Sequence, residues 1–440
     1  MPAVPFTRRS VLAGGLAALA APRPLRATEA RSVRIGAVLP IGGGAIPAGR
    51  INLRQVGEVA RTGLVLAEED ASLNAGLLGW SAVVRTANAP TAETVERAAR
   101  RLVEREGVSV LVGGYTRAEA EVLSRVAEET GALYLNVGAT SDALRQAACR
   151  AGTFHVEASA AMYLDAIFGW YVRAGFRRWH LVRDEDPENV ARHDRALAAL
   201  KSRHWAVEVT GTGVLAQDDS RRGPAVLAEI GRARPQVVLL LTDWRSQLDF
   251  LSRFQAAELG AAVVGFPEPA TQTRDYYLAA NRAAPVAGSG RRAALWEATL
   301  DAYGARELNA RFAARWGRPM DPPAWTAYQA VKIAVEAAIA TGSTEGRDLA
   351  AHLAGDATVF DVSKGIGVSF RPWDHQLRQS LYLVKINEQA SDSLALEALA
   401  ARASLEGELP AIYMPGTDPV QRLDQIGDVA ASARCGPKGG

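Results

Sequence analysis

The groups best suited to bind a small ligand lie where the predicted strands end. Short apolar strands alternate with helical patterns along this 440-residue chain, and open parallel sheets bind ligands outside the carboxyl ends of their strands. Loops and helix starts at those ends present free backbone N–H groups and the positive end of the helix dipole, which favour an anionic ligand. The segments concerned are residues 40–44, 87–90, 113–117, 136–141, 184–186, 242–245 and 266–269.

The sequence lacks the residue sets that typically carry out catalysis or hold a cofactor. Its six histidines are scattered without a metal-ligand spacing, and it contains neither a P-loop nor a G-x-S-x-G elbow. Gly42-Gly43-Gly44 follows the first strand without the G-x-G-x-x-G spacing, and the second strand ends in Ala87-Asn88 instead of an acid for a ribose. The acidic run Asp184-Glu185-Asp186 is typical of a solvent-facing loop. We therefore expect no enzyme activity, no cofactor and no metal.

Two blocks of alternating strands and helices position these strand ends. The alternation predicts parallel sheets with helices on both faces. The first block has predicted strands at 33–40, 81–86, 108–112 and 132–137, and predicted helices at 56–73, 91–106 and 118–130. The second has strands at 179–183, 206–211, 236–241 and 261–266, and helices at 161–174, 190–203, 224–233 and 245–259. Further along we expect helices at 293–316 and 323–341, a hairpin over 364–386, and a tail after Glu388 that runs over the surface.

Composition excludes several classes of protein. Hydrophobic residues make up 48% of the chain, charged residues 22%, and the net charge is +2. These values exclude a disordered chain and a small disulfide scaffold, and the length suggests two domains. Charges of both signs are spread along the chain without a basic block, so we do not expect a nucleic-acid partner.

The first 27 residues have the layout of an export signal. Arg8 and Arg9 precede an uncharged apolar run from Val11 to Ala21, and small residues surround Ala27. The paired arginines favour twin-arginine export, with cleavage near Ala27. Removing this segment removes four arginines and no acid, which changes the net charge from +2 to 2 − 4 = −2. We therefore expect an exported, periplasmic protein.

Two cysteines, Cys149 and Cys435, are the only ones in the chain. In an oxidising compartment two thiols in one chain are a natural disulfide pair, which here would tie the C-terminal tail to the middle of the chain. The alternative is a pair of free thiols.

Several stretches resemble type I periplasmic substrate-binding proteins of ABC importers, the leucine/isoleucine/valine-binding family. The resemblance covers about residues 33–388 and rests on the order and spacing of five segments rather than on one motif. These segments are Ile35–Pro40 with the glycines after it, Val108–Gly114, Val137-Gly138-Ala139-Thr140, Ala327–Lys332 and Gly365–Phe370. A weaker likeness, to members associated with pyrroloquinoline-quinone-dependent alcohol dehydrogenase systems, rests on Ala147–Arg150 and on Leu423–Gly427 with Cys435.

The resemblance implies an α/β fold with two doubly wound parallel-sheet lobes joined by a three-segment hinge. Lobe 1 would comprise residues 32–152 and 272–357, and lobe 2 residues 153–271 and 358–388, followed by a tail at 389–440. Ligand binding would close the cleft between the lobes, and the membrane permease would recognise the closed form. We expect a monomer. The alternative function is an exported enzyme-accessory or ligand-sensing protein on the same scaffold.

The resemblance also implies which residues bind the ligand. Loops of the first lobe would hold its carboxylate, and loops of the second lobe would complete the site, with an acid facing the ammonium when the ligand is an amino acid. Tyr115 and Arg117 stand where amino-acid binders have small hydroxyl residues, so small organic acids, aromatic acids and alcohol-derived metabolites remain open as ligands. The implied residues are Tyr115, Thr116, Arg117, Ala139 and Thr140 in the first lobe, and Glu157, Ser159, Asp243, Trp244 and Glu268 in the second.

Overall fold

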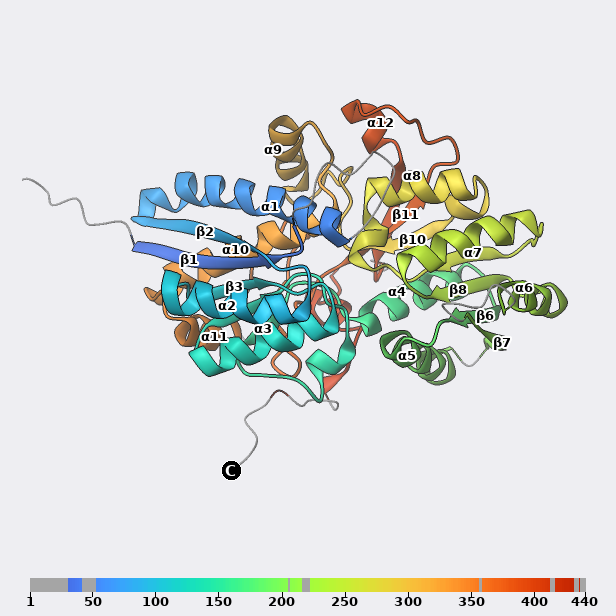
Figure 1. Cartoon of the computed structure of the whole chain (residues 1–440), viewed down its shortest axis with the longest axis horizontal. Helices are drawn as coiled ribbons and strands as arrows, with labels where there is room; N and C mark the ends of the chain where they lie inside the picture. Colours follow the sequence, from blue (N-terminus) through green and yellow to red (C-terminus); the bar gives the residue numbers. More distant parts are fainter. Residues whose placement is uncertain are drawn as a thin grey trace, which may run out of the picture.

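A computed structural model describes residues 31–41, 53–204, 206–215, 222–355, 358–411, 416–430 and 435. The predicted export signal, residues 1–27, and Gly42–Gly44 lie outside the described residues. Two parallel α/β lobes lie side by side (Figure 1). Among the described residues, no helix has both the length and the apolar character needed to cross a membrane.

The first lobe contains a five-stranded sheet in the order β2-β1-β3-β4-β5, in which every neighbouring pair is parallel. Its strands are short and apolar, and all four residues of β3 are buried, as expected for a sheet covered on both faces. The strands are β1 (Arg31–Leu39), β2 (Trp80–Asn88), β3 (Val110–Gly113), β4 (Leu133–Asn136) and β5 (Thr153–His155).

Alternate residues of β1 face two different cores. Val33, Ile35 and Ala37 pack with residues of α1 and α10, whereas Val38 packs with residues of α2 and α3. Successive residues of a strand point to opposite faces of the sheet, so α1 and α10 cover one face and α2 and α3 cover the other. The helices of this lobe are α1 (Leu53–Asn74), α2 (Ala92–Glu106), α3 (Arg117–Thr130), α10 (Pro322–Thr341) and α11 (Gly346–Leu353).

The second lobe contains a four-stranded parallel sheet in the order β7-β6-β8-β9. Of its two inner strands, β6 and β8, the second is buried throughout. The strands are β6 (Arg178–Arg183), β7 (Glu208–Val214), β8 (Val237–Leu241) and β9 (Ala262–Gly265). The helices are α4 (Ala160–Arg173), α5 (Pro187–Arg203), α6 (Arg222–Ala233), α7 (Trp244–Ala256) and α8 (Arg274–Ala283).

A small antiparallel sheet, β10-β11-β12, corrects three of the predictions. β10 (Arg291–Ala294) pairs with β11 (Leu381–Ile386), so the helix predicted over 293–316 is only α9 (Ala305–Trp316). β11 pairs with β10 and β12 instead of forming a hairpin with 368–370, where a single bridge joins Phe370 and Leu377. β12 (Ala403–Leu409) belongs to the segment that was expected to run over the surface. Shorter elements are η1 (Gly76–Leu78), η2 (Asp142–Arg145), η3 (Pro269–Gln272), η4 (Ala287–Ser289), α12 (Leu396–Ala400) and α13 (Pro419–Leu423).

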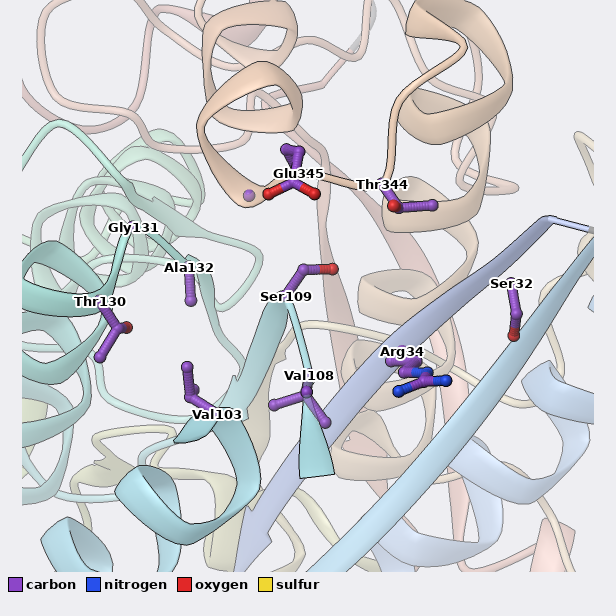
Figure 2. A pocket seen from close by; sticks show the side chains of 12 residues that line it. Ser32, Arg34, Val103, Val108, Ser109, Thr130, Gly131, Ala132, Thr344 and Glu345 are labelled. Carbon is purple, nitrogen blue, oxygen red and sulfur yellow. The ribbon is translucent and has the colours of Figure 1, made fainter. Parts of the chain in front are cut away.

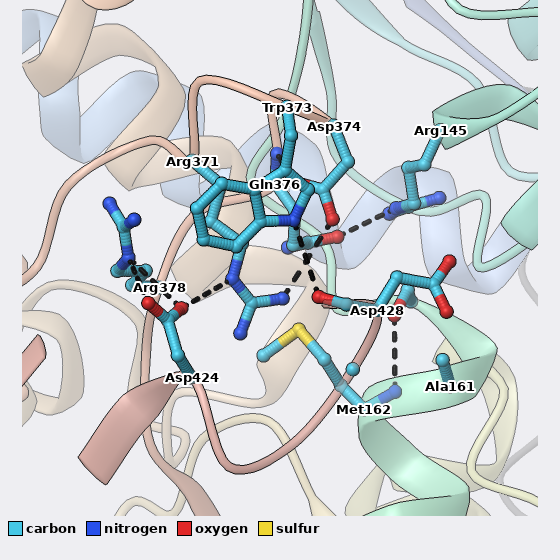
Figure 3. A network of polar contacts seen from close by, with 12 residues as sticks. Arg145, Ala161, Met162, Arg371, Trp373, Asp374, Gln376, Arg378, Asp424 and Asp428 are labelled. Atoms are coloured by element: carbon cyan, nitrogen blue, oxygen red, sulfur yellow. Dashed lines mark hydrogen bonds and ion pairs between the residues drawn. The ribbon is translucent and has the colours of Figure 1, made fainter. Parts of the chain in front are cut away.

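The C-terminal segment packs against the chain around Arg371, and Figure 3 shows Asp424 and Asp428 beside Arg371 and Trp373. Arg371 donates to the Asp424 carboxylate (2.7 Å) and to the carbonyls of Leu423 (3.1 Å) and Ile426 (2.7 Å). The Asp428 carboxylate accepts from Gln146 (2.7 Å), and its carbonyl accepts from Trp373 (3.2 Å).

A disulfide between Cys149 and Cys435 completes this attachment, with the two Cα atoms 5.4 Å apart. The described part of the tail is therefore packed against the body instead of running loosely over it. The disulfide, the hydrogen bonds of Arg371 and the burial of Leu423 and Ile426 hold it there.

Beside this attachment, Arg145 is 2% exposed, and each of its guanidinium nitrogens donates a hydrogen bond. Nε donates to the side chain of Gln376 (2.6 Å), and Nη2 donates to the carbonyl of Glu157 (2.8 Å) in the crossing between β5 and α4. Nη1 donates to the carbonyls of Ala139 (3.2 Å) and Ser141 (2.9 Å). We call Arg145, Arg371, Asp374, Gln376 and residues 424–428 the hinge junction.

Candidate ligand-binding site

A cavity of about 630 Å³ lies between the lobes, at the carboxyl ends of their strands. Loops after β3 and β4 form its wall on the first lobe, and loops after β6, β8 and β9 form its wall on the second. Its size suits a small organic molecule. The lining residues are Tyr115–Ala118, Glu121, Gly138–Ser141, Asp184, Asp186–Asn189, Arg192, Asp243–Arg245 and Glu268–Ala270.

Three helices begin at this cavity: α3, α5 and α7. Their N-caps are Thr116, Asp186 and Asp243, whose side chains accept from backbone N–H groups of the first helical turn. The positive ends of three helix dipoles therefore converge on the cavity, an arrangement that favours a negatively charged ligand group.

Glu119 of α3 uses two of the backbone N–H groups on the first-lobe side of the cavity. Its carboxylate accepts from the backbone N–H groups of Tyr115 (2.9 Å) and Thr116 (3.3 Å), so these donors are already used. Burial raises the pKa of Glu119, while the two N–H groups oppose that shift. The next N–H groups, those of Arg117 and Ala118, belong to the first turn of α3, where no intrahelical acceptor exists.

Tyr115 packs its ring over Gly138, where a Cβ atom would collide with it. The side chain is 6% exposed, and its hydroxyl has no hydrogen-bond partner among the described residues. Burial raises the pKa of Tyr115 far above its ordinary value, so the hydroxyl keeps its proton. Tyr115 thus forms part of the cavity wall, with its ring over the position that Gly138 leaves open.

Arg192 of α5 spans the cavity between the lobes. Nη2 donates to the Thr140 hydroxyl of the first lobe (3.0 Å), while Nη1 donates to Glu268 (2.7 Å) and Asn189 (2.7 Å) of the second. The guanidinium lies 4.1 Å from the centroid of the Phe266 ring, and this contact fixes the orientation of the guanidinium plane. The residue is 7% exposed, and its Nε has no acceptor among the described residues.

Glu188 forms two more contacts across the cavity. It accepts a hydrogen bond from the Ser141 hydroxyl (3.0 Å) and lies 3.9 Å from the Arg117 guanidinium. Together with the bond between Arg192 and Thr140, these contacts join the two lobes through side chains alone. The cleft is therefore closed by interactions that can separate without disturbing the backbone of either lobe.

The acids on the second-lobe wall already accept hydrogen bonds. Asp243 accepts from Arg245 N–H (2.7 Å), Ser246 N–H (3.2 Å) and the Ser246 hydroxyl (2.9 Å). Partial burial raises the pKa of Glu268, an effect that Arg192 opposes and that Asp243 and Asp184 reinforce. Burial likewise raises the pKa of Asp184, although the Asn189 amide opposes it. On the same wall, the Arg245 guanidinium lies 4.4 Å from the centroid of the Trp244 ring.

The structure brings together most, but not all, of the residues that the sequence indicated. Glu157 and Ser159 do not line the cavity. Glu157 is 1% exposed and accepts from the Tyr163 hydroxyl (2.6 Å), while Ser159 caps α4 by accepting from Met162 N–H (3.1 Å). The predicted residues that do line it are Tyr115, Thr116, Arg117, Ala139, Thr140, Asp243, Trp244 and Glu268.

Sequence reasoning missed the part of the wall formed by α5. The helix was predicted to begin at Val190, whereas Asp186 caps it and Pro187 opens it. Asp before Pro is a start signal that would have placed the beginning correctly. With that start, Glu188, Asn189 and Arg192 share one face of the helix by their spacing of three and four.

A second cavity, of about 510 Å³, lies at the opposite, amino ends of the first-lobe strands (Figure 2). Arg34 and Glu345 are the only charged residues among those that line it, and Figure 2 shows them on different sides. Gly107 and Gly131, the glycines that end α2 and α3, also line it. This cavity lacks the converging helix starts and the buried arginine of the cleft.

Comparisons with known proteins place these features in context. A family model described as periplasmic binding protein matches residues 32–392. Leu/Ile/Val-binding protein homolog 8 of Brucella abortus is 30% identical over 110 residues, which are 25% of each of the two chains. The chain thus spans a quarter of the length of the curated relatives it matches.

Solved structures extend the likeness over most of the chain. An amino acid ABC transporter substrate-binding protein from Pseudomonas fluorescens Pf-5 matches with 18% identity and a TM-score of 0.69, covering 88% of this chain and 97% of that one. A solute-binding protein from R. palustris in complex with benzoate has 22% identity and a TM-score of 0.65, covering 85% and 98%. A branched-chain amino acid transporter substrate-binding protein from Streptococcus pneumoniae in complex with isoleucine has 14% identity and a TM-score of 0.67, covering 86% and 99%. At these identities the likeness shows the fold, and the predicted subgroup linked to quinone-dependent alcohol dehydrogenases stays a prediction.

Proposed function

The chain belongs to the periplasmic binding protein family, and on this premise we propose that it captures a small molecule, an amino acid or small organic acid, between its lobes. It would then deliver this solute to the membrane permease of an ABC importer. The observation that carries the proposal is the closed cleft itself: three helix N-termini and a buried arginine surround a cavity of suitable size. Binding and release need no catalytic group.

The ligand's carboxylate would bind where the donors converge. The Arg117 and Ala118 N–H groups at the start of α3, the Thr140 hydroxyl and Arg192 all belong to lining residues. Hydrogen bonds from such donors to a carboxylate are charge-assisted and so stronger than neutral ones. Two solved relatives support an acid as ligand, because one was obtained with benzoate and another with isoleucine.

Release would require the lobes to move apart about the segments that join them. We propose lobe 1 as residues 32–152 and 272–357, and lobe 2 as residues 153–271 and 358–388, with two adjustments. β5 pairs with β4 and so joins the first-lobe sheet, and α8 packs on α7 and so joins the second lobe. The contacts made by Arg192 and Glu188 would break on opening, whereas those of Arg145 would remain. A permease would then distinguish the closed form by the relative positions of the two lobes.

A ligand screen on the mature protein tests the proposal. Thermal shift should identify at least one amino acid or organic acid that raises the melting temperature, by an increment that grows with concentration. Titration calorimetry should then give a stoichiometry of one, without turnover of the compound. If a broad panel of both classes leaves the melting temperature unchanged, the proposal fails.

We also propose that the protein acts in the periplasm after twin-arginine export. Fractionation of producing cells should place the mature chain outside the cytoplasm, and mass spectrometry should find its N-terminus near residue 28. Replacing both Arg8 and Arg9 by Lys should keep the chain inside the cell. Efficient export of that variant would contradict this route.

A further inference from the structure

We infer that Asp428 joins the two lobes outside the ligand cavity and favours the closed cleft, and that it is therefore a positioning residue for ligand capture. Asp428 belongs to the C-terminal segment and does not line the cavity. Its role rests on the proposed movement of the lobes and adds a contact that acts before any ligand arrives. The observations that carry it are where the C-terminal segment is attached and what each oxygen of the Asp428 carboxylate bonds.

The C-terminal segment is fixed to the second lobe at several points. The Gly427 N–H group donates to the Asp165 carboxylate of α4 (2.9 Å). Arg203 of α5 donates to the same carboxylate (2.7 Å) and to the carbonyls of Gln425 (3.1 Å) and Gly427 (3.2 Å). The approach is so close that a Cβ atom on Gly427 would lie 2.9 Å from Met162 of α4. Because these contacts involve the backbone of the segment, it should move with the second lobe.

The same segment also reaches the first lobe. Gln146 and Cys149 lie between β4 and β5, which are paired strands of the first-lobe sheet. The Gln146 amide donates to the Asp428 carboxylate, and Cys149 forms the disulfide with Cys435. The segment that should move with the second lobe is therefore attached to the first lobe as well.

Asp428 divides its two carboxylate oxygens between the lobes. Oδ2 accepts from Gln146 Nε2 of the first lobe (2.7 Å), and Oδ1 accepts from Arg195 Nη1 of α5 in the second. Asp428 is buried, so dissolved ions screen its pair with Arg195 much less than they screen an exposed pair. Hydrogen bonds to a carboxylate are also stronger than neutral ones. One buried side chain thus connects a residue of each lobe.

Both partners of Asp428 are close to the cleft. Arg195 follows Arg192 by three residues on α5, and residues three apart lie on the same side of a helix. Gln146 ends the η2 segment, which begins after Ser141 of the cavity wall. Opening that moves α5 away from the first lobe would stretch the bridge through Asp428. A contact that is better made in the closed form increases the population of that form, even without a ligand.

Small-angle scattering of the ligand-free mature protein tests this role with Asp428→Asn. The substitution keeps the size of the side chain and removes the charge that pairs with Arg195. The radius of gyration should shift to a larger value, because the lobes should separate more often. Asp70→Asn is the matched control, since Asp70 of α1 accepts from Arg311 (2.8 Å) and Tyr328 (2.7 Å) on α9 and α10, two helices that pack against α1. Its radius should equal that of the wild type.

Gln146→Ala provides a second test, because it removes only the first-lobe partner of Asp428. Its radius should also increase, and the variant with both changes should match Asp428→Asn, since both changes remove the same link. Urea denaturation separates this role from simple stabilisation: Asp428→Asn and Asp70→Asn should both lower the urea midpoint, whereas only the first should expand the protein.

Far-ultraviolet circular dichroism identifies the variants that are folded, and Gln146→Ala decides if Asp428→Asn is not. A wild-type radius in either folded variant overturns the role of Asp428, and so does an equal expansion of Asp70→Asn. None of these measurements needs a ligand. The proposed function is tested apart from them, by whether any compound of the screen raises the melting temperature.

Discussion

The cleft and the hinge junction both join the two lobes through a buried arginine, and they differ in what those arginines bond. Arg145 donates from every guanidinium nitrogen, mostly to backbone carbonyls, and so fixes chain segments to one another. Arg192 bonds only side chains and leaves Nε without an acceptor. Arg145 therefore fixes backbone segments to one another, whereas the contacts of Arg192 join side chains that can separate when the lobes move apart.

The two regions are also connected. Arg145 binds the carbonyls of Ala139 and Ser141, which flank Thr140, the residue that Arg192 contacts from the other lobe. The hinge junction therefore positions the loop that the cleft uses. We expect changes at the hinge junction to affect stability first, and changes in the cleft to affect binding with little loss of stability.

The largest effect is expected for Arg145→Ala. Several buried carbonyls would lose their donor at once, so the free energy of unfolding should fall by roughly 3–5 kcal/mol. Urea denaturation of the mature protein measures this change. Arg97→Ala, at an exposed position on α2, serves as the control and should change the value by less than about 0.5 kcal/mol. A loss below 1 kcal/mol for Arg145→Ala, as a rough threshold, would mean that the hinge junction does not hold the fold.

The disulfide should have the next largest effect. It closes a loop with a sequence separation of 286 residues, so Cys149→Ser combined with Cys435→Ser should lower the free energy of unfolding by about 2–4 kcal/mol. The unreduced, denatured mature protein should contain no titratable thiol. Finding two free thiols there would reject the bridge, and equal stability of the double variant would reject its contribution.

Glu157 gives a pH-dependent effect of intermediate size. Burial raises its pKa to about 7, and the Tyr163 hydroxyl and Arg145 oppose that rise only in part. The pKa of Glu157 is thus higher in the folded protein than in the unfolded one, so the protonated carboxyl favours the folded state. This contribution to the free energy of unfolding is complete below about pH 4 and is lost as pH rises through 7. Glu157→Gln removes this dependence, so its stability relative to the wild type should increase by roughly 1–3 kcal/mol between pH 5 and pH 8.

Unfolding curves of the wild type and Glu157→Gln at pH 5, 6, 7 and 8 provide the measurement. Taking the difference between the two proteins cancels the titration of groups that they share. A difference that stays constant over this range would show that Glu157 does not titrate there.

The smallest effect on stability is expected in the cleft. Glu188→Gln removes the charge that faces Arg117 across the lobes, and partly exposed pairs of this kind contribute at most about 1 kcal/mol. The lobes should nevertheless separate more often, which small-angle scattering would detect as a larger radius of gyration. Glu121→Gln is the matched control, because Glu121 pairs with Arg117 within α3 (2.7 Å) and does not bridge the lobes. An identical radius for both variants would argue against Glu188 as a closing contact.

Regular local patterns allowed most of the fold to be predicted. Buried strands such as 108–112 and amphipathic helices such as 91–106 show their period within a single segment, and the structure contains both within a few residues of the expected ends. β10 and β12 could not be found in this way. β10 is four residues long and pairs with β11, a strand far from it in the sequence. β12 contains two glutamates and a glycine, residue types that are depleted in strands, and it forms by pairing with β11.

The residues of the candidate site likewise differ in how far local sequence patterns could predict them. Tyr115 and Thr140 follow predicted strands directly, so their place at the cavity could be expected from the fold. Arg192 lies in the second turn of a helix and reaches the cavity only because Asp186 starts that helix early. Glu157 was expected at the ligand and is instead buried in the crossing between the lobes, since a single sequence does not show which way a crossing residue points.

Hydrogen exchange with and without a bound acid tests the central claim most directly, because it observes both regions in one experiment. Ligand should slow exchange in residues 115–118, 139–141 and 186–192, the segments at the cleft. It should leave exchange unchanged in residues 371–376 and 424–428, the segments that contain most of the hinge junction. Slowing confined to the hinge junction, or absent from the cleft while calorimetry shows binding, would contradict capture between the lobes.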